Sequence, residues 1–363
     1  MKNRYCLIMA GGVGTRFWPM STSKKPKQFL DILNIGKSML QLTFERFLKH
    51  CLVENIWIIT NDKYKSLVLQ QLPEIKSKQV LTEPFMRNTA VCIAYASYKI
   101  AKQNSYAQMI VTPSDHQITN MRDFSNTIEK GFEFISTNRD CLLTLGITPS
   151  RPETAYGYIQ FDNNLNEKEI KKVKTFTEKP NYKMATVFVN SGEFLWNSGM
   201  FMWSISAICK AFEEYLPDIH QLFSKAQNKF YTEEEKGIIK KIYKVCQIIS
   251  IDYGIMEKSK NVYVLKTKDI GWSDIGTWTA LYEQLKHDEN NNVVSGKNTL
   301  VKFYDSKNCF ITSNRKKFII AEGLDNYFVI ETDKILLIFR KDDEHIIRKI
   351  MTDIEMEFGK KYT

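Results

Sequence analysis

The sequence has 363 residues, of which 43% are hydrophobic and 25% are charged, and its formal net charge at pH 7 is +10. This length suits two domains, and the ordinary composition excludes a largely disordered chain. A positive net charge favours anionic partners such as phosphorylated metabolites. Because the lysines are scattered along the chain and arginines are few, we expect no nucleic-acid partner.

The seven cysteines are widely spaced, odd in number and without a Cys-x-x-Cys pair. They are typical of small buried side chains in a reducing compartment and indicate neither a disulfide framework nor a zinc site. The first apolar run covers only residues 5–10, which is short for a signal peptide, and no run of eighteen apolar residues follows it. We therefore expect a cytoplasmic protein with no membrane partner.

Strands and helices alternate in the first half of the sequence. Compact apolar runs predict strands at residues 5–10, 55–60, 79–82 and 107–112, and amphipathic stretches predict helices at 38–50, 63–72 and 88–103. Ser38 and Gln41 have the capping-box pattern at the start of the first helix. This alternation predicts an α/β fold with a mostly parallel, Rossmann-like sheet flanked by helices, in which ligands bind at the carboxyl ends of strands.

The composition changes near His287, where a polar turn separates two parts of the chain. Residues 141–287 continue the mixed pattern, so we expect the main domain to cover residues 1–287. Short strand-like runs then recur at close to ten-residue spacing, and a helix is expected at residues 343–358. Residues 288–363 are therefore expected to form a small β-rich domain with a terminal helix.

A glycine-rich loop follows the first strand, with the sequence Gly11-Gly12-Val13-Gly14-Thr15-Arg16. Glycines allow backbone N–H groups to approach phosphate oxygens, the hydroxyl of Thr15 can donate, and Arg16 can bind phosphate in a bidentate manner. Neither the Rossmann nor the P-loop glycine pattern matches, because Phe17 stands at the third Rossmann glycine and no Gly-Lys-Ser/Thr occurs. The loop therefore indicates phosphate binding, with a tight turn between strand and helix as the alternative.

The loop continues into a longer pattern, Phe17-Trp18-Pro19-x-Ser21 and then Lys25-Pro26-Lys27-Gln28-Phe29. This pattern resembles the signature of the sugar nucleotidyltransferases, and its Phe-Trp-Pro and Pro-Lys-Gln-Phe variants resemble the mannose-1-phosphate guanylyltransferase branch. The resemblance implies that Gly11, Gly12, Gly14 and Thr15 surround a nucleoside triphosphate. It also implies catalytic roles for Arg16 and Lys27 in offsetting the charge of the phosphates.

Two aspartates are candidate magnesium ligands. Asp115 follows a predicted strand in Pro113-Ser114-Asp115-His116, and Asp274 lies in Trp272-Ser273-Asp274-Ile275-Gly276. Mg²⁺ takes one or two carboxylates together with waters and substrate phosphates. Taken alone, each aspartate is more typical of a turn or a helix cap. Both segments resemble family motifs in the family order, which implies that they bind Mg²⁺, with Mn²⁺ as an alternative.

Three further segments resemble the sugar-binding motifs of the family, and they contain Gly157, Glu178-Lys179 and Asn197. A glutamate accepts hydrogen bonds from sugar hydroxyls, a lysine binds phosphate as a point charge, and an asparagine both donates and accepts. The alternatives are a hairpin glycine, a surface turn and an asparagine turn. Asp252 lies in another family-like segment and is a sugar-binding or structural residue.

The segment from Thr82 to Ala90 resembles the base pocket of the guanylyltransferase branch, which implies nucleotide binding by Glu83, Asn88 and Thr89. A carboxylate or carbonyl acceptor suits the N1–H and 2-amino group of guanine. The competing interpretation is that Asn88 only caps the following helix.

The resemblance implies that GTP and mannose 1-phosphate give GDP-mannose and pyrophosphate by in-line displacement. The alternatives are the same chemistry with another hexose or heptose 1-phosphate, and a non-catalytic relative that binds nucleotide sugars. The β-rich part resembles a short left-handed β-helix, and a homodimer contact through it is one alternative. Longer relatives continue into a phosphomannose isomerase domain, and since this sequence stops at Thr363 we expect no isomerase activity.

Overall fold

The computed structural model describes residues 1–12, 14–162, 169–296 and 299–363. The chain folds into two compact units, and each is assembled from segments that are far apart in the sequence. The first, which we call the sheet unit, contains residues 1–11, 43–114 and 118–272. The second, which we call the coil unit, contains residues 12–42, 115–117 and 273–363.

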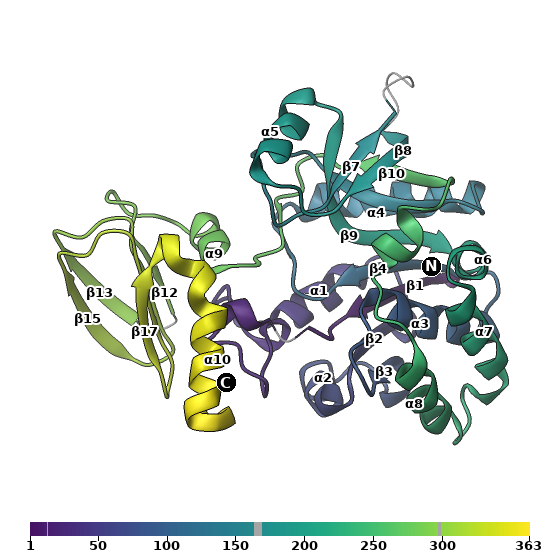
Figure 1. The fold of residues 1–363 in the computed structure, drawn as a ribbon, viewed down its shortest axis with the longest axis horizontal. Coiled ribbons are helices and arrows are strands. Elements are labelled where there is room, and N and C mark those ends of the chain that lie inside the picture. The colour runs from purple at the N-terminus through teal and green to yellow at the C-terminus, as the bar shows by residue number, and fades with distance from the viewer. Residues whose placement is uncertain (13, 163–168, 297–298) are drawn as a thin grey trace. The chain divides into compact units, whose positions relative to one another are not determined.

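A mixed sheet forms the centre of the sheet unit (Figure 1). Within the described residues it has nine strands in the order β3-β2-β1-β4-β9-β6-β10-β8-β7. Their bounds are β1 Arg4–Met9, β2 Ile56–Asn61, β3 Val80–Glu83, β4 Gln108–Pro113, β6 Leu142–Ile147, β7 Tyr158–Phe161, β8 Ile170–Thr177, β9 Phe194–Ser204 and β10 Val262–Lys266. The predicted parallel pairing is correct for β3-β2-β1-β4 and for β6-β10. Strand β9 runs antiparallel between β4 and β6, and β8 is antiparallel to both β10 and β7, so the sheet is mixed and the predicted mostly parallel order holds for only part of it.

Helices cover both faces of this sheet, because its strands are buried on both sides. Phe201 and Trp203 of β9 belong to the core formed with α3 (Thr89–Gln103), α6 (Ile205–Tyr215), α7 (Pro217–Ala226) and α8 (Glu235–Val245). Met202, between them, faces α4 (Met121–Thr137), where a Cβ on Gly131 would overlap its sulfur. The remaining helices are α1 (Met39–Phe47), which crosses the division at residue 42, α2 (Lys65–Gln71) and α5 (Tyr182–Ser191).

Short parallel strands stack in the coil unit (Figure 1). Strands β12 (Val293–Ser295), β14 (Phe310–Ser313) and β16 (Tyr327–Glu331) pair in parallel, and β17 (Leu336–Arg340) is antiparallel to β16. Strands β13 (Thr299–Tyr304) and β15 (Lys317–Glu322) form a second parallel pair. Thr299 pairs with Lys317, and Phe310 pairs with Phe328. The chain therefore forms a coil in which each turn takes about 18 residues and its strands pair with those of the preceding turn. The unit also contains α9 (Trp278–Gln284) and α10 (Ile347–Phe358).

One apolar cluster joins the N-terminal loop to the stacked strands inside the coil unit. Trp278 of α9 is fully buried, and its ring centroid lies 4.9 Å from that of Phe17 and 5.8 Å from that of Phe310. The indole N–H of Trp278 donates to the carbonyl of Trp18 at 3.3 Å. The glycine-rich loop is therefore held by the same core as the C-terminal strands.

Contacts in the structure divide the chain differently from the predicted boundary at residue 287. Residues 12–42 and 273–287 belong with the C-terminal strands, because their aromatic side chains complete that core. The capping box is present as predicted, with the Ser38 N–H donating to Gln41 at 2.9 Å and the Gln41 N–H to Ser38 at 3.2 Å. No helix in the described ranges is long and apolar enough to cross a membrane.

We predict that Trp278→Ala lowers the free energy of unfolding of the coil unit by about 3–5 kcal/mol, because it removes a fully buried aromatic side chain. Urea titration followed by tryptophan fluorescence and circular dichroism measures this loss. Leu300→Ala is the control, since Leu300 is 69% exposed and its replacement is expected to change stability by less than about 0.5 kcal/mol. Equal small effects of the two substitutions would contradict the shared core.

Candidate active site

The glycine-rich loop has two kinds of glycine. Gly12 is exposed, and a Cβ at that position would meet nothing within 4 Å. Gly14 has φ 66° and ψ 37°, and its Cβ would lie 2.6 Å from the Cβ of Lys27. Gly14 is thus required by the close approach of Lys27, whereas Gly12 leaves its backbone open to a ligand. Val13 of this motif lies outside the described residues.

Lys27 is the most constrained charged residue of the signature. It begins a 3₁₀ turn (Lys27–Phe29) and is only 3% exposed. Its ammonium group donates to the carboxylate of Asp115 at 2.9 Å, to the carbonyl of Asp115 at 3.2 Å and to the carbonyl of Asp274 at 2.7 Å. The next side chain, Gln28, donates to the carbonyl of Gly12 at 2.8 Å. The structure thus brings Lys27 and both predicted metal ligands together within the coil unit.

The electrostatics of this cluster favour an ionised Asp115. Burial opposes ionisation, but the charge of Lys27, the charge of His116 and the hydrogen bonds from Lys27 and the backbone together hold the pKa of Asp115 below its usual value. Arg16, by contrast, is an exposed side chain. Its positive charge acts on Glu344, whose pKa is nevertheless raised because the carboxyl is buried. The structure does not place Arg16 in the hydrogen-bonded Lys27 cluster.

The backbone around Asp274 is unusual. The carboxylate of Asp274 accepts from the Gly276 N–H at 2.9 Å, which folds the segment into a tight turn. Ile275, between them, is fully buried and has φ 40°. A positive φ at a β-branched residue is unfavourable and persists only where the surrounding structure imposes it. Sequence reasoning did not identify this strained position, since no residue type in the motif signals it.

The donor set of this cluster fits magnesium. Among the described residues no group of three or more His, Cys, Asp or Glu side chains could hold a metal ion by itself. Mg²⁺ does not require such a group, because it keeps waters and combines one or two carboxylates with phosphate oxygens. Lys27 contacts the carboxylate of Asp115 and the backbone carbonyl of Asp274, so each aspartate is a candidate to supply one carboxylate.

The predicted sugar-binding residues form a second cluster, within the sheet unit. A Cβ on Gly157 would lie 2.5 Å from Oε1 of Glu178, so glycine is required for the approach of this carboxylate. The Asn197 N–H donates to the carbonyl of Gly157 at 2.8 Å. Lys179 has φ 45°, is largely exposed, and its ammonium group lies 3.2 Å from the Glu178 carboxylate. The structure thus brings Gly157, Glu178, Lys179 and Asn197 together.

Asp252 belongs to this second cluster, although the sequence left its role open. The side-chain amide of Asn197 donates to Asp252 at 2.8 Å, and the amide oxygen accepts from the Gly199 N–H at 3.1 Å. Burial, together with the negative charge of Glu178, raises the pKa of Asp252 to about 6. Asn197 therefore orients a carboxyl group that titrates near neutral pH.

The predicted base-binding residues have structural partners. Asn88 caps α3, because its side chain accepts from the Thr89 N–H at 2.8 Å, and its φ is 66°. The hydroxyl of Thr89 accepts from the Ile251 N–H at 2.8 Å and thereby holds the segment that leads to Asp252. Glu83 ends β3, and burial raises its pKa to about 7. The helix-cap interpretation of Asn88 is thus correct, whereas Glu83 is a buried carboxyl with no ion pair to a lysine or arginine among the residues that the structure describes.

We predict that Gly14→Ala lowers the free energy of unfolding by about 1–3 kcal/mol, because alanine disfavours this positive φ and its methyl group would displace Lys27. Gly12→Ala is the matched control, since its methyl group enters open space. Chemical denaturation of both variants measures the difference. Equal losses would contradict a specific packing role for Gly14.

We predict that Glu178→Gln lowers the pKa of Asp252, because it removes the neighbouring negative charge. A pKa of about 6 exceeds the value of about 3.9 for an exposed aspartate, so the folded state holds this proton more tightly. Protonated Asp252 therefore contributes to the stability of the folded state at acidic pH, and this contribution is lost as the pH rises through about 6. NMR titration of labelled aspartate measures the shift, and an unchanged pKa in the variant would contradict the coupling.

Comparison with known proteins identifies the family. Residues 5–291 match the nucleotidyl transferase family. The chain is 34% identical over 364 residues to an Escherichia coli mannose-1-phosphate guanylyltransferase and 33% identical over 361 residues to one from Klebsiella pneumoniae, covering 98% of this chain and 76% and 75% of those proteins. A solved structure from Thermus thermophilus, named mannose-1-phosphate geranyltransferase, superposes with a TM-score of 0.85 at 27% identity, covering 97% of this chain and 99% of that one. The signature loop, the Lys27 cluster and these matches together show that the chain belongs to the nucleotidyl transferase family.

Proposed function

We propose that this protein transfers GMP from GTP to α-D-mannose 1-phosphate, which gives GDP-mannose and pyrophosphate. The observation that carries the proposal is the Lys27 cluster, in which a buried ammonium group donates to the carboxylate of Asp115 and to the backbone carbonyl of Asp274, next to the glycine-rich loop. The sugar and the base follow from the relatives named mannose-1-phosphate guanylyltransferase.

In this reaction a phosphate oxygen of the sugar phosphate forms a new bond to the α-phosphorus of GTP. The bond from that phosphorus to the bridging oxygen breaks, and pyrophosphate leaves with the electron pair. The attacking oxygen is already ionised near neutral pH, so positioning and charge stabilisation are sufficient and no general base is needed. Asp115 and Asp274 would hold Mg²⁺ or Mn²⁺, which would supply charge stabilisation on the phosphates.

We assign the residues around the nucleotide to the triphosphate and to the base. Lys27 and Arg16 offset the negative charge of the triphosphate, and Gly11, Gly12 and Thr15 offer donors to it. Gly14 acts by positioning Lys27. The ionised form of Glu83 accepts from guanine, and Asn88 and Thr89 hold in place the start of α3 and the segment before Asp252. This assigns Asn88 and Thr89 to positioning more than to direct contact.

The sugar phosphate is bound by the second cluster. Glu178 and Asp252 accept hydrogen bonds from sugar hydroxyls, and Asn197 keeps Asp252 oriented. Lys179 binds the phosphate as a point charge. Its exposure allows it to exchange the contact with Glu178 for one with the ligand.

We further propose that the protein is cytoplasmic and that it can form a homodimer. All seven cysteines are free thiols and six of them are buried, which suits a reducing compartment. The parallel stacking of β12, β14 and β16 supports a short β-helix, for which we propose the left-handed form.

The test measures pyrophosphate release with four nucleoside triphosphates against the 1-phosphates of mannose, glucose and fucose. We predict release with GTP and mannose 1-phosphate, and a loss of about 10²–10³ in rate for Lys27→Ala and for Asp274→Ala. Lys349→Ala, which changes an exposed lysine of α10, is the control and is expected to retain the rate.

Release with another pair of substrates would preserve the chemistry and overturn the proposed specificity. Absence of release from folded protein with every pair would support the non-catalytic alternative. Omitting the divalent cation tests the roles of Asp115 and Asp274, since the rate should then fall to background and return with Mg²⁺ or Mn²⁺.

A further inference from the structure

A cavity of about 550 Å³ lies within the coil unit and is separate from the Lys27 cluster. Its wall is formed by residues 19–20, 22, 24–25, 30–31 and 34, by the turns at 312–314 and 332–335, and by residues 360–363. Arg16, Lys27, Asp115 and Asp274 do not line it. The volume falls in the range of about 300–1,000 Å³ that is usual for small-molecule sites.

The wall carries an excess of positive charge. Five lysines line the cavity, namely Lys24, Lys25, Lys334, Lys360 and Lys361, against two side-chain carboxylates, those of Asp31 and Asp333. Within the part of the chain that the structure describes, Lys24, Lys25 and Lys334 form no ion pair with a carboxylate. Lys360 lies 3.9 Å from Glu355, at the limit of an ion pair, and is 81% exposed. Their charges are thus available to a ligand.

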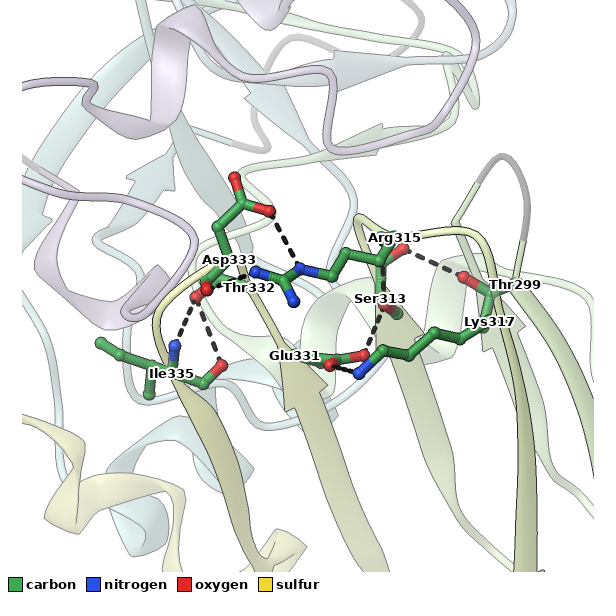
Figure 2. Close-up of polar contacts among 8 residues, drawn as sticks. All are labelled: Thr299, Ser313, Arg315, Lys317, Glu331, Thr332, Asp333 and Ile335. Atoms are coloured by element: carbon green, nitrogen blue, oxygen red, sulfur yellow. Dashed lines mark hydrogen bonds and ion pairs between the residues drawn. The ribbon is translucent and has the colours of Figure 1, made fainter.

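The nearby acidic groups already have other partners (Figure 2). Asp333 accepts from the guanidinium of Arg315 at 3.2 Å, and Figure 2 shows that Arg315 reaches this carboxylate from the neighbouring turn. Glu331 pairs with Lys317 and accepts from Ser313 at 2.7 Å. Asp31 accepts from the N–H groups of residues 35 and 36, at 2.9 and 2.8 Å. None of these three carboxylates depends on the lysines of the cavity wall.

The wall is also internally fixed. The backbones of Thr22 and Lys25 exchange two hydrogen bonds of 3.1 Å, which form the turn that presents Lys24 and Lys25. The indole N–H of Trp18 donates to the carbonyl of Tyr362 at 2.8 Å. The Thr332 N–H donates to the carbonyl of Ile335 at 2.8 Å, and the Thr332 hydroxyl also contacts the backbone of Ile335 (Figure 2). These bonds close the turn that contains Lys334. The lysines therefore project from ordered turns rather than from loose loops.

We propose that this cavity is a second binding site, for a small molecule that carries a phosphate or pyrophosphate group. Lysine binds phosphate as a compact point charge, and several ammonium groups around one concave wall suit a ligand with two or more negative charges. The hydroxyl and amide groups of Thr22, Asn34 and Asn314 offer hydrogen bonds to the rest of such a molecule. The site is additional to the proposed reaction and does not depend on it.

The experiment uses inorganic pyrophosphate as the probe and isothermal titration calorimetry of the full chain. Because the Lys27 cluster could also bind pyrophosphate, the titration is made in the Lys27→Ala background. We predict that this variant still binds pyrophosphate, and that adding Lys24→Gln and Lys334→Gln weakens the binding by about tenfold or more. Adding Lys349→Gln, which removes an exposed lysine away from the cavity, is expected to leave it unchanged.

Loss of all binding in Lys27→Ala alone would overturn the proposal, as would undiminished binding after the two cavity lysines are replaced. Thermal melting of each variant establishes that it is folded, and the single Lys24→Gln and Lys334→Gln variants repeat the test with smaller changes. Anionic vesicles of phosphatidylglycerol separate a membrane surface from a small molecule. Lysine-dependent binding of vesicles without binding of pyrophosphate would overturn the small-molecule site. Since every readout is binding, a failure here is distinguishable from a failure of the proposed reaction.

Discussion

The ammonium group of Lys27 ties together three chain segments that are far apart in the sequence. The ammonium group donates to three acceptors, which belong to residues 115 and 274. Each of its three N–H groups therefore has a partner, although the side chain is buried. Burying a charge without such partners would cost several kcal/mol, so the position of Lys27 determines the positions of both carbonyls and of the Asp115 carboxylate. Gly14 must then be glycine, because any side chain would enter the space of Lys27. The hydrogen bonds of Lys27 therefore constrain the glycine-rich loop and the backbone at both candidate metal ligands.

Local patterns in the sequence predicted the elements well, since they depend on neighbours a few residues apart. The short apolar runs at close to ten-residue spacing after His287 predicted strands, which the structure contains as β13 to β17, and Ser38 with Gln41 predicted a capping box that is present. The signature from Gly11 to Phe29 led to the family because its residue types and spacing are specific. Each of these predictions required only the chemistry of one short segment.

Long-range packing was not predictable in the same way. The aromatic residues Phe17 and Trp278 each look like an ordinary core residue in the sequence, and only the fold shows that they share one cluster with the C-terminal strands. The antiparallel direction of β9 could not be predicted for a related reason, since an apolar run indicates burial but not strand direction. The positive φ of Ile275 is also imposed by its surroundings and contradicts the preference of the residue itself.

The two clusters of candidate site residues use carboxylates in opposite electrostatic settings. Asp115 lies beside a buried cation, which lowers its pKa and keeps it anionic, as a ligand of a divalent cation must be. Asp252 lies beside another carboxylate with only an amide to stabilise its charge, and its pKa rises to about 6. Near neutral pH, Asp252 can therefore accept a hydrogen bond when ionised and donate one when protonated, which suits a hydroxyl group that can do both. The same residue type thus has opposite ionisation tendencies in the two clusters, because a lysine stabilises the charge of Asp115 and a glutamate opposes the charge of Asp252.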